Sequence, residues 1–224
     1  MIYIDIHTHQ KTNTDGVFSI YNVIAGRDKL PENQFFSIGV HPWYLNSAYL
    51  DILIRNISNP NCLAIGECGM DALPQSTEKY ALELQERVFT AQIHLAEKHR
   101  KPLIIHCVKC YDKLLHLKKQ YQPLMPWIIH GYTKNKELAL QMINAGFYLS
   151  FGAGILRSKT NQEALKSLPL NRFFLETDMA QNSINEIYET AASLLSLKIS
   201  DLQLQIQSNF MHVFEIDLPL KKVN

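Results

Sequence analysis

IYIDIHTH, at residues 2–9, indicates a strand that ends in two histidines. Ile2, Ile4 and Ile6 occupy alternate positions, as expected where one face of a strand packs on helices. His7 and His9 are two positions apart, and side chains at i and i+2 of a strand point the same way. Two imidazoles can therefore reach one metal ion from this strand end, although two unrelated histidines are the alternative.

Further short apolar segments follow along the chain, with longer amphipathic stretches between most of them. The expected strands are residues 2–7, 35–40, 62–67, 102–107, 127–130, 147–151, 172–177 and 203–208. The longest expected helix spans residues 77–99, where Leu84, Val88 and Leu95 fall on one helical face. Weaker helical patterns follow Trp43, Cys110, Lys134, Ser158, Asn182 and Phe210.

This alternation of strands and helices predicts an α/β fold with a parallel sheet. Eight is also the number of strands that closes a (β/α)8 barrel. The chain has 224 residues, fewer than the about 250 typical of that barrel, so we expect trimmed loops. Because no linker or internal repeat interrupts the pattern, we expect one domain over residues 1–224.

The composition is that of a globular protein. Apolar residues make up 46% of the chain and charged residues 19%, which excludes a disordered chain. The formal net charge is +1, whereas a protein that holds nucleic acid by charge alone is normally more basic. Any contact with nucleic acid is therefore expected to be local, brief, or helped by bound metal ions.

The N-terminal sequence and the cysteines indicate the cellular compartment in which the protein is expected. MIYIDIHTHQ lacks the basic and apolar regions of a signal peptide, and no apolar run approaches the about 20 residues that cross a bilayer. We therefore expect a cytoplasmic protein without membrane contact. Cys107 and Cys110 form one CxxC with no second pair, so a structural zinc site is not expected and reduced thiols are.

Nearly every expected strand ends in a polar or metal-binding residue. Beyond His7 and His9, these residues are His41, Glu67, His106, His130, Asp178 and Asn209. The C-terminal ends of barrel strands form the active-site face, so these side chains are expected to meet there. A group of histidines and carboxylates at one face predicts a metal site.

Each of these residues also has a structural alternative. Glu67 follows the apolar run CLAIG, where an acid is costly to bury unless it is paired or metal-bound; a loop cap or a pair with a lysine is the alternative. His106 ends PLIIH and His130 ends PWIIH, and either one alone would more often be a core histidine. Asp178 ends RFFLETD and would otherwise be a helix N-cap. Taken with the histidine pair, the set predicts metal ligands.

Taken in order, these segments resemble the TatD family of metal-dependent deoxyribonucleases. The matching segments are DIHTH (5–9), GVHPW (39–43), IGECGMD (65–71), KPLIIHC (101–107), IIHGYT (128–133), YLSFGAG (148–154), FLETD (174–178) and SNFMHVF (208–214). Each motif alone is weak, but the ordered set extends over almost the whole chain. The likeness is to a short group within that family.

The resemblance implies a TIM-type barrel of the metallo-dependent hydrolase kind with two divalent ions. The implied ligands are His7, His9, Glu67, His106, His130 and Asp178. Glu67 would bridge the two ions, and Asp178 would deprotonate the attacking water, so these two acids are the expected catalytic residues. Histidine ligands suit Zn or Mn better than Mg, yet the resemblance implies that Mg supports activity, and Mg, Mn and Zn all stay open.

The implied reaction is hydrolysis of phosphodiester bonds in DNA, the expected substrate, at single strands or strand ends; no stable protein partner is expected. Longer family members usually carry an Arg where this chain has Val108, with Lys109 beside it. A shorter segment, MAQNSINEIYE, replaces the usual proline and long loop after Asp178. His41 and Lys109 are expected substrate contacts, with a structural hydrogen bond and a solvated surface as their alternatives.

Two other functions compete with DNA cleavage. Val108 and the shortened segment motivate a metal-dependent hydrolase of another bond, such as an amide, lactone, ester or phosphotriester. A non-catalytic metal-binding protein is the third reading, but it would be marked by a lost ligand and all of the implied ligands are present. Trp43 and Tyr44 would stack on a base in the first function, or pack under a loop.

Overall fold

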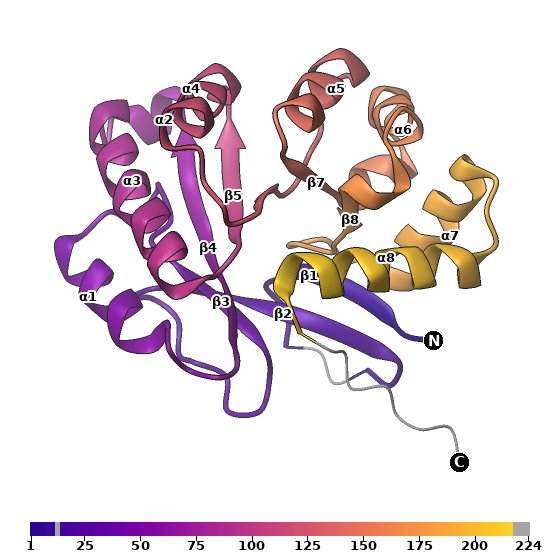
Figure 1. The fold of residues 1–224 in the computed structure, drawn as a ribbon, viewed down its shortest axis with the longest axis horizontal. Coiled ribbons are helices and arrows are strands. Elements are labelled where there is room, and N and C mark those ends of the chain that lie inside the picture. The colour runs from indigo at the N-terminus through magenta and orange to yellow at the C-terminus, as the bar shows by residue number, and fades with distance from the viewer. Residues whose placement is uncertain (12–13, 217–224) are drawn as a thin grey trace.

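A computed structural model of the chain describes residues 1–11 and 14–216. Eight strands form one sheet in sequential order, and all neighbouring pairs are parallel. The strands are β1 (Tyr3–Thr8), β2 (Val17–Ile24), β3 (Phe36–Gly39), β4 (Cys62–Asp71), β5 (Leu103–Val108), β6 (Trp127–Ile129), β7 (Tyr148–Phe151) and β8 (Phe173–Leu175). The sheet curls until β8 approaches β1, so the expected α/β barrel is confirmed (Figure 1).

The helices lie around the outside of this sheet (Figure 1). They are α1 (Ser47–Asn56), α2 (Pro74–Thr77), α3 (Leu82–His99), α4 (Tyr111–Tyr121), α5 (Lys136–Asn144), α6 (Lys159–Lys166), α7 (Ile184–Leu195) and α8 (Ile199–Phe214), with short 3-10 helices at Ala153–Leu156 and Leu170–Arg172. Among the described residues, no helix separates β1 from β2 or β2 from β3. These direct connections are where the chain is shorter than a regular (β/α)8 barrel.

Strand β2 was not among the expected strands. It alternates Phe18 and Ile20 with partly polar neighbours, but it has no helix on either side to mark it as part of a repeating unit. It pairs with both β1 and β3 and so supplies the strand that completes the barrel.

The expected strand at residues 203–208 is wrong, because this segment lies inside α8. The run LQLQIQ (202–207) alternates as a strand would, but the burial follows a helix. Leu202 and Ile206 are buried four positions apart, whereas Leu204 between them is 55% exposed. The helical pattern expected after Phe210 is therefore the end of α8, and Asn209 is a buried helix residue that donates hydrogen bonds to the carbonyls of Leu170 and Phe173.

The longest expected helix also begins later than predicted, at Leu82 in α3, because the short helix α2 ends at Thr77. The prediction of one domain over residues 1–224 includes residues 12–13 and 217–224, which lie outside the described part, and it stays a prediction. In the described residues, the longest helices are too short or too polar to cross a membrane.

The barrel closes at a seam between β1 and β8. The backbone joins across it near its upper end, where the Asp178 N–H donates to the His7 carbonyl at 2.9 Å. Nearer the start of β1, side-chain hydrogen bonds take the place of backbone hydrogen bonds between the strands. Asp5 accepts from the Thr177 N–H at 3.0 Å and from its hydroxyl at 2.6 Å. The Tyr188 hydroxyl, from α7, lies 3.1 Å from both the N–H and the carbonyl of Ile4. The seam is therefore satisfied largely by buried side chains.

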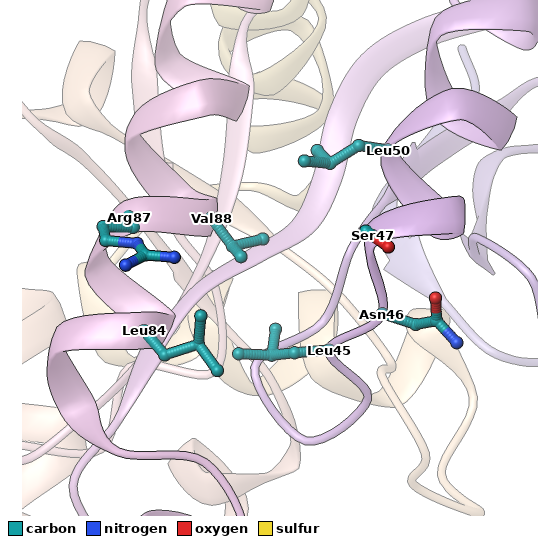
Figure 2. A pocket seen from close by; sticks show the side chains of 7 residues that line it. All are labelled: Leu45, Asn46, Ser47, Leu50, Leu84, Arg87 and Val88. Atoms are coloured by element: carbon teal, nitrogen blue, oxygen red, sulfur yellow. The ribbon is translucent and has the colours of Figure 1, made fainter.

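A groove lies on the outer surface between α1 and α3 (Figure 2). Leu45, Leu50, Leu84 and Val88 form its apolar wall, with Arg87 at the side. It contains none of the strand-end histidines and carboxylates, so it is separate from the site described next.

Candidate metal centre

All six implied ligands meet at one mouth of the barrel. His7 and His9 come from the end of β1, Glu67 from β4 and His106 from β5. His130 directly follows β6, and Asp178 lies three residues beyond β8. Nearly all of them line one cavity of about 250 Å³, and the buried His7 lies behind it. The wall of this cavity includes Ile24, His41, Trp43, Tyr44 and Met179. The strands thus bring residues that are far apart in sequence to one face.

A β-bulge places Glu67 at the centre of the group. Ile65 pairs with Leu103 and Cys68 with Ile105, so two residues of β4 face one residue of β5. Such a bulge bends the strand and redirects a side chain. A glycine is needed nearby, because a Cβ at Gly69, whose φ is +127°, would collide with the His106 carbonyl. The side chain of Glu67 is 5% exposed and points among the histidines.

Two histidines lie between one oxygen of Glu67 and the carboxylate of Asp178, close to both. His7 Nε2 and His9 Nε2 each lie 3.6 Å from Glu67 Oε2. The same two nitrogens lie 3.6 Å and 3.5 Å from Asp178 Oδ1. Ligand atoms about 2.0–2.2 Å from one ion in tetrahedral geometry are about 3.3–3.6 Å apart. These four spacings therefore fit ligands that share a cation.

His7 supports this fit independently. Its side chain is fully buried, yet within the described residues neither ring nitrogen has a hydrogen-bond partner. A buried polar atom without a partner is costly. A cation between His7 Nε2 and the two carboxylates would give that nitrogen a partner.

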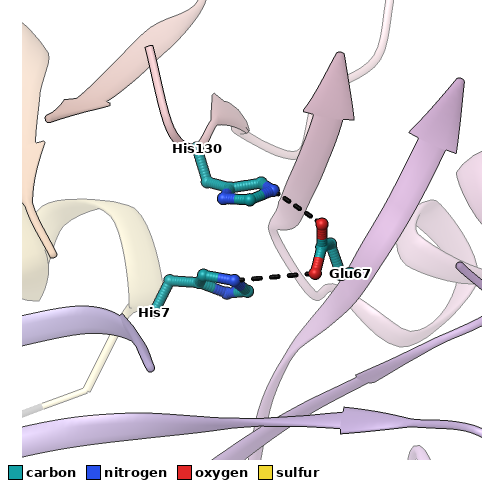
Figure 3. A group of neighbouring side chains, drawn as sticks. All are labelled: His7, Glu67 and His130. Carbon is teal, nitrogen blue, oxygen red and sulfur yellow. Dashed lines mark hydrogen bonds and ion pairs between the residues drawn. The ribbon is translucent and has the colours of Figure 1, made fainter. Parts of the chain in front are cut away.

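The other oxygen of Glu67 faces a second group of imidazoles. His106 Nδ1 and His130 Nε2 each lie 2.8 Å from Glu67 Oε1, and His41 Nε2 lies 3.1 Å away. Figure 3 shows His7 and His130 approaching different oxygens of this carboxylate. One carboxylate thus connects two groups of possible ligands, as a bridging ligand must.

Further buried groups hold these side chains from behind. Asp71 Oδ2 lies 3.1 Å from His106 Nε2 and accepts the Trp43 indole N–H at 2.7 Å. Glu176 Oε1 lies 3.5 Å from His130 Nδ1. Asn22 accepts the Glu67 backbone N–H at 2.9 Å and donates to Glu67 Oε2 at 3.3 Å. Partners of this kind fix the ring orientation of metal-binding histidines.

Asp71 and Asn22 were not predicted from the sequence. A signal for Asp71 was present, because it ends the buried run GECGMD as Glu67 follows CLAIG. Asn22 lies on β2, and without that strand its position beside Glu67 had no signal.

The buried acids and histidines of the site shift one another's pKa values. Burial alone would raise the pKa of Glu67, but the charge of His130 and hydrogen bonds from His106 and His130 hold it well below its ordinary value. Burial alone would lower the pKa of His130, but the charge of Glu67 raises it well above 6.5. Burial likewise opposes a rise at His106, whose pKa is raised by its bonds to Asp71 and Glu67. Since metal ligands must lose their protons, ion binding here would release protons.

The two expected substrate contacts occupy different places. His41 lies two residues beyond β3, is 4% exposed, and lines the cavity. Lys109 follows β5 with a φ of +56°, is exposed, and is not among the residues of the cavity wall.

Comparison with known proteins identifies relatives of this chain. A family model described as TatD related DNase matches residues 7–215. YcfH of Escherichia coli, named an uncharacterized metal-dependent hydrolase, is 26% identical over 223 residues, which cover 92% of this chain and 82% of YcfH. A protein of Vairimorpha ceranae, named as a TATDN1 homolog, is 28% identical over 158 residues. That match covers 70% of this chain and spans 56% of the relative's length.

Solved structures agree on the fold. YJJV, a TatD homolog from Escherichia coli, superposes with a TM-score of 0.83 at 18% identity, covering 96% of this chain and 98% of YJJV. A TatD family hydrolase from Entamoeba histolytica gives a TM-score of 0.76, also at 18% identity and over 96% and 98% of the two chains. Because the family model matches nearly the whole sequence, this chain belongs to the TatD related DNase family of metal-dependent hydrolases.

Proposed function

We propose that this chain hydrolyses phosphodiester bonds in DNA, at single strands or strand ends, with two divalent ions. The observation that carries the proposal is Glu67, whose Oε2 lies 3.6 Å from His7 and His9 and whose Oε1 lies 2.8 Å from His106 and His130. When bound, Mg, Mn or Zn ions would activate a water and stabilise the attacking and leaving oxygens.

Asp178 is the proposed proton acceptor. Burial would raise the pKa of Asp178, but the neighbouring His7, whose Nε2 lies 3.6 Å from Asp178 Oδ1, lowers it, so the carboxylate is ionised at neutral pH. Its side chain is 39% exposed and lines the cavity, where a water can reach it. Hydrolysis forms a P–O bond from water and breaks the ester P–O bond. One proton of the water passes to Asp178, which then returns it, directly or through solvent, to the leaving oxygen; the hydroxyl of the water stays on the phosphate.

The aromatic wall of the cavity supports a nucleic acid substrate. Trp43 is 40% exposed, and its indole is held in place by Asp71. Beside it, the guanidinium of Arg27 lies 3.9 Å from the centre of the Tyr44 ring, and Lys79 donates to the Trp43 carbonyl at 3.2 Å. Aromatic rings with nearby cations are how proteins bind single strands, by stacking on bases and attracting phosphates.

His41 and Lys109 are the proposed substrate contacts. His41 reaches the cavity itself, whereas the exposed ammonium of Lys109 would attract a phosphate farther along the strand. Lysine acts as a point charge and does not grip a phosphate in two places as arginine does. Contact by Lys109 is therefore expected to help binding more than orientation.

The direct test is cleavage of end-labelled single-stranded DNA by the purified protein with Mg, Mn or Zn. We expect shortening from a strand end, and loss of cleavage in Asp178→Asn. Asp201→Asn, at an exposed position of α8, is the matched control and should cleave normally. An absence of cleavage with every metal would refute the proposal.

A hydrolase of another bond is the second candidate. It is favoured by the apolar wall at Ile24 and Met179, which offers no charge for a phosphate backbone. A panel of small esters, lactones, amides and phosphotriesters would decide. A kcat/KM above that for DNA for any of them would replace the first proposal.

A further inference from the structure

His41 stands apart from the other imidazoles of the site. Its Nε2 lies 3.1 Å from Glu67 Oε1, and its ring centre lies 4.8 Å from that of His106. By distance alone, His41 would count as a third imidazole ligand beside His106 and His130.

The hydrogen bond at the other ring nitrogen decides its chemistry. The Trp43 backbone N–H donates to His41 Nδ1 at 3.0 Å, and a backbone N–H is always a donor. Nδ1 must therefore present its lone pair, so the proton of the neutral ring lies on Nε2. A nitrogen that carries a proton has no lone pair for a metal ion.

His106 has the opposite arrangement. Its Nε2 faces the carboxylate of Asp71 at 3.1 Å, and a carboxylate accepts, so a proton lies on Nε2. Nδ1 faces Glu67 Oε1 at 2.8 Å and can ligate once ion binding displaces the proton between them. His130 likewise directs Nδ1 towards Glu176 and leaves Nε2 for the cavity. The three rings that converge on Glu67 Oε1 thus divide into two ligands and one donor.

We propose that His41 is a catalytic hydrogen-bond donor, whose neutral Nε2–H binds a non-bridging oxygen of the phosphodiester, and that it holds no metal ion. The donor role rests on the proposed function above. His41 lines the cavity beside Glu67, His106 and His130, and in the metal-free protein its N–H donates to Glu67 Oε1. When Glu67 Oε1 binds an ion instead, as proposed, this N–H would be available to a substrate oxygen in the same cavity. A fixed donor aimed at an oxygen that gains charge in the transition state lowers the barrier without reorganisation.

The fixed geometry adds to this role. His41 is 4% exposed, and its ring is held between the Trp43 N–H and Glu67, with its edge against the Trp43 ring at 5.1 Å between centres. These contacts on both sides keep the ring in one orientation.

The first experiment measures metal binding and protonation without turnover. We expect His41→Ala and His41→Gln to bind as many ions as the wild type, with affinities within about threefold, whereas His106→Ala loses one ion. Nitrogen NMR of labelled histidine should find the His41 proton on Nε2 with and without metal. Loss of an ion in His41→Ala, affinity weakened tenfold or more, or a proton on Nδ1 would overturn the proposal.

The second experiment measures DNA cleavage by the same proteins. Removal of one such donor lowers kcat by about 10²- to 10³-fold, so His41→Ala should lose kcat to that extent with little change in KM. His41→Gln keeps an N–H and should recover part of the loss, while His116→Ala, at an exposed position of α4, is the control. A kcat within about threefold of the wild type in His41→Ala refutes the donor role. If the wild type cleaves no DNA, the proposed function fails, and the metal and NMR results still decide whether His41 is a ligand.

Discussion

The two sides of Glu67 differ in how closely their members approach. On the Oε2 side, His7, His9 and Asp178 keep spacings of 3.5–3.6 Å. On the Oε1 side, His106 and His130 close to 2.8 Å, and buried acids lie behind both rings. The spacings of the first group fit ligands around a cation, whereas the second group is closed by hydrogen bonds in the metal-free protein. In the proposed two-ion site, an ion on the second side would therefore have to displace protons, and an ion on the first side would not.

Glu67→Gln is expected to have the largest effect, because both sides depend on this carboxylate. The variant keeps the shape but loses the charge that both groups of ligands share. Loss of a supporting partner typically costs about 10–100-fold in metal affinity or activity, and loss of Glu67 should exceed that. Metal analysis should find fewer ions on both sides. If Glu67→Gln still binds two ions and keeps activity within tenfold, the comparison between the two sides fails.

Asp71→Asn should weaken metal binding on the Oε1 side of Glu67 and leave the Oε2 side unchanged. An amide can present its oxygen to His106 Nε2 but lacks the charge that supports the ring as a ligand, so one ion should bind about 10–100-fold more weakly. The ion beside His7 and His9 should keep its affinity. Isothermal titration with Mn or Zn resolves the two binding steps, and an equal loss in both would contradict the assignment.

The protons on the Oε1 side predict how stability depends on pH in the metal-free protein. A group whose folded pKa is raised stabilises the protein below its unfolded value and loses that contribution as pH rises through the folded value. The raised pKa values of His106 and His130 place this loss above pH 6.5. Asp5, whose pKa burial raises to about 7, acts in the same direction, whereas the lowered pKa of His41 has its effect below 6.5.

The Tm of the metal-free protein should therefore fall as the pH rises above about 6.5. Differential scanning fluorimetry in the presence of a chelator measures this directly. His130→Gln should flatten the dependence, while His116→Gln on the surface should leave it unchanged. A Tm that rises over this range would show that the imidazoles are neutral without metal.

Lys109→Ala is expected to have the smallest effect. Its exposed ammonium would contact one phosphate outside the cavity. Removing one phosphate contact should raise KM a few-fold, leave kcat unchanged, and reduce the dependence of log affinity on log salt by about 1. An unchanged salt dependence would place Lys109 away from the bound strand.

The sequence predicted the residues that line the site better than the residues that hold them in place. Proposed ligands such as His130 and Asp178 follow apolar strands, so local pattern and barrel geometry together predict that they lie at one face. Asn22 and Asp71 act through their distance from Glu67 and His106, and no spacing along the chain carries that information. The error at 203–208 has a different origin, since alternating glutamines imitate a strand while Leu202 and Ile206 follow a helical period.

The seam between β1 and β8 would give a cation bound at the proposed site a structural role. His7 and His9 belong to the first strand and Asp178 follows the last, so an ion that they share would span the joint that closes the ring. Removing it would leave that joint to a few backbone bonds and to the side chains of Asp5 and Tyr188. Chelation should thus speed hydrogen exchange at the amides of His9 and Asp178 before it affects the opposite strands. An ion at this position would stabilise the closure of the barrel.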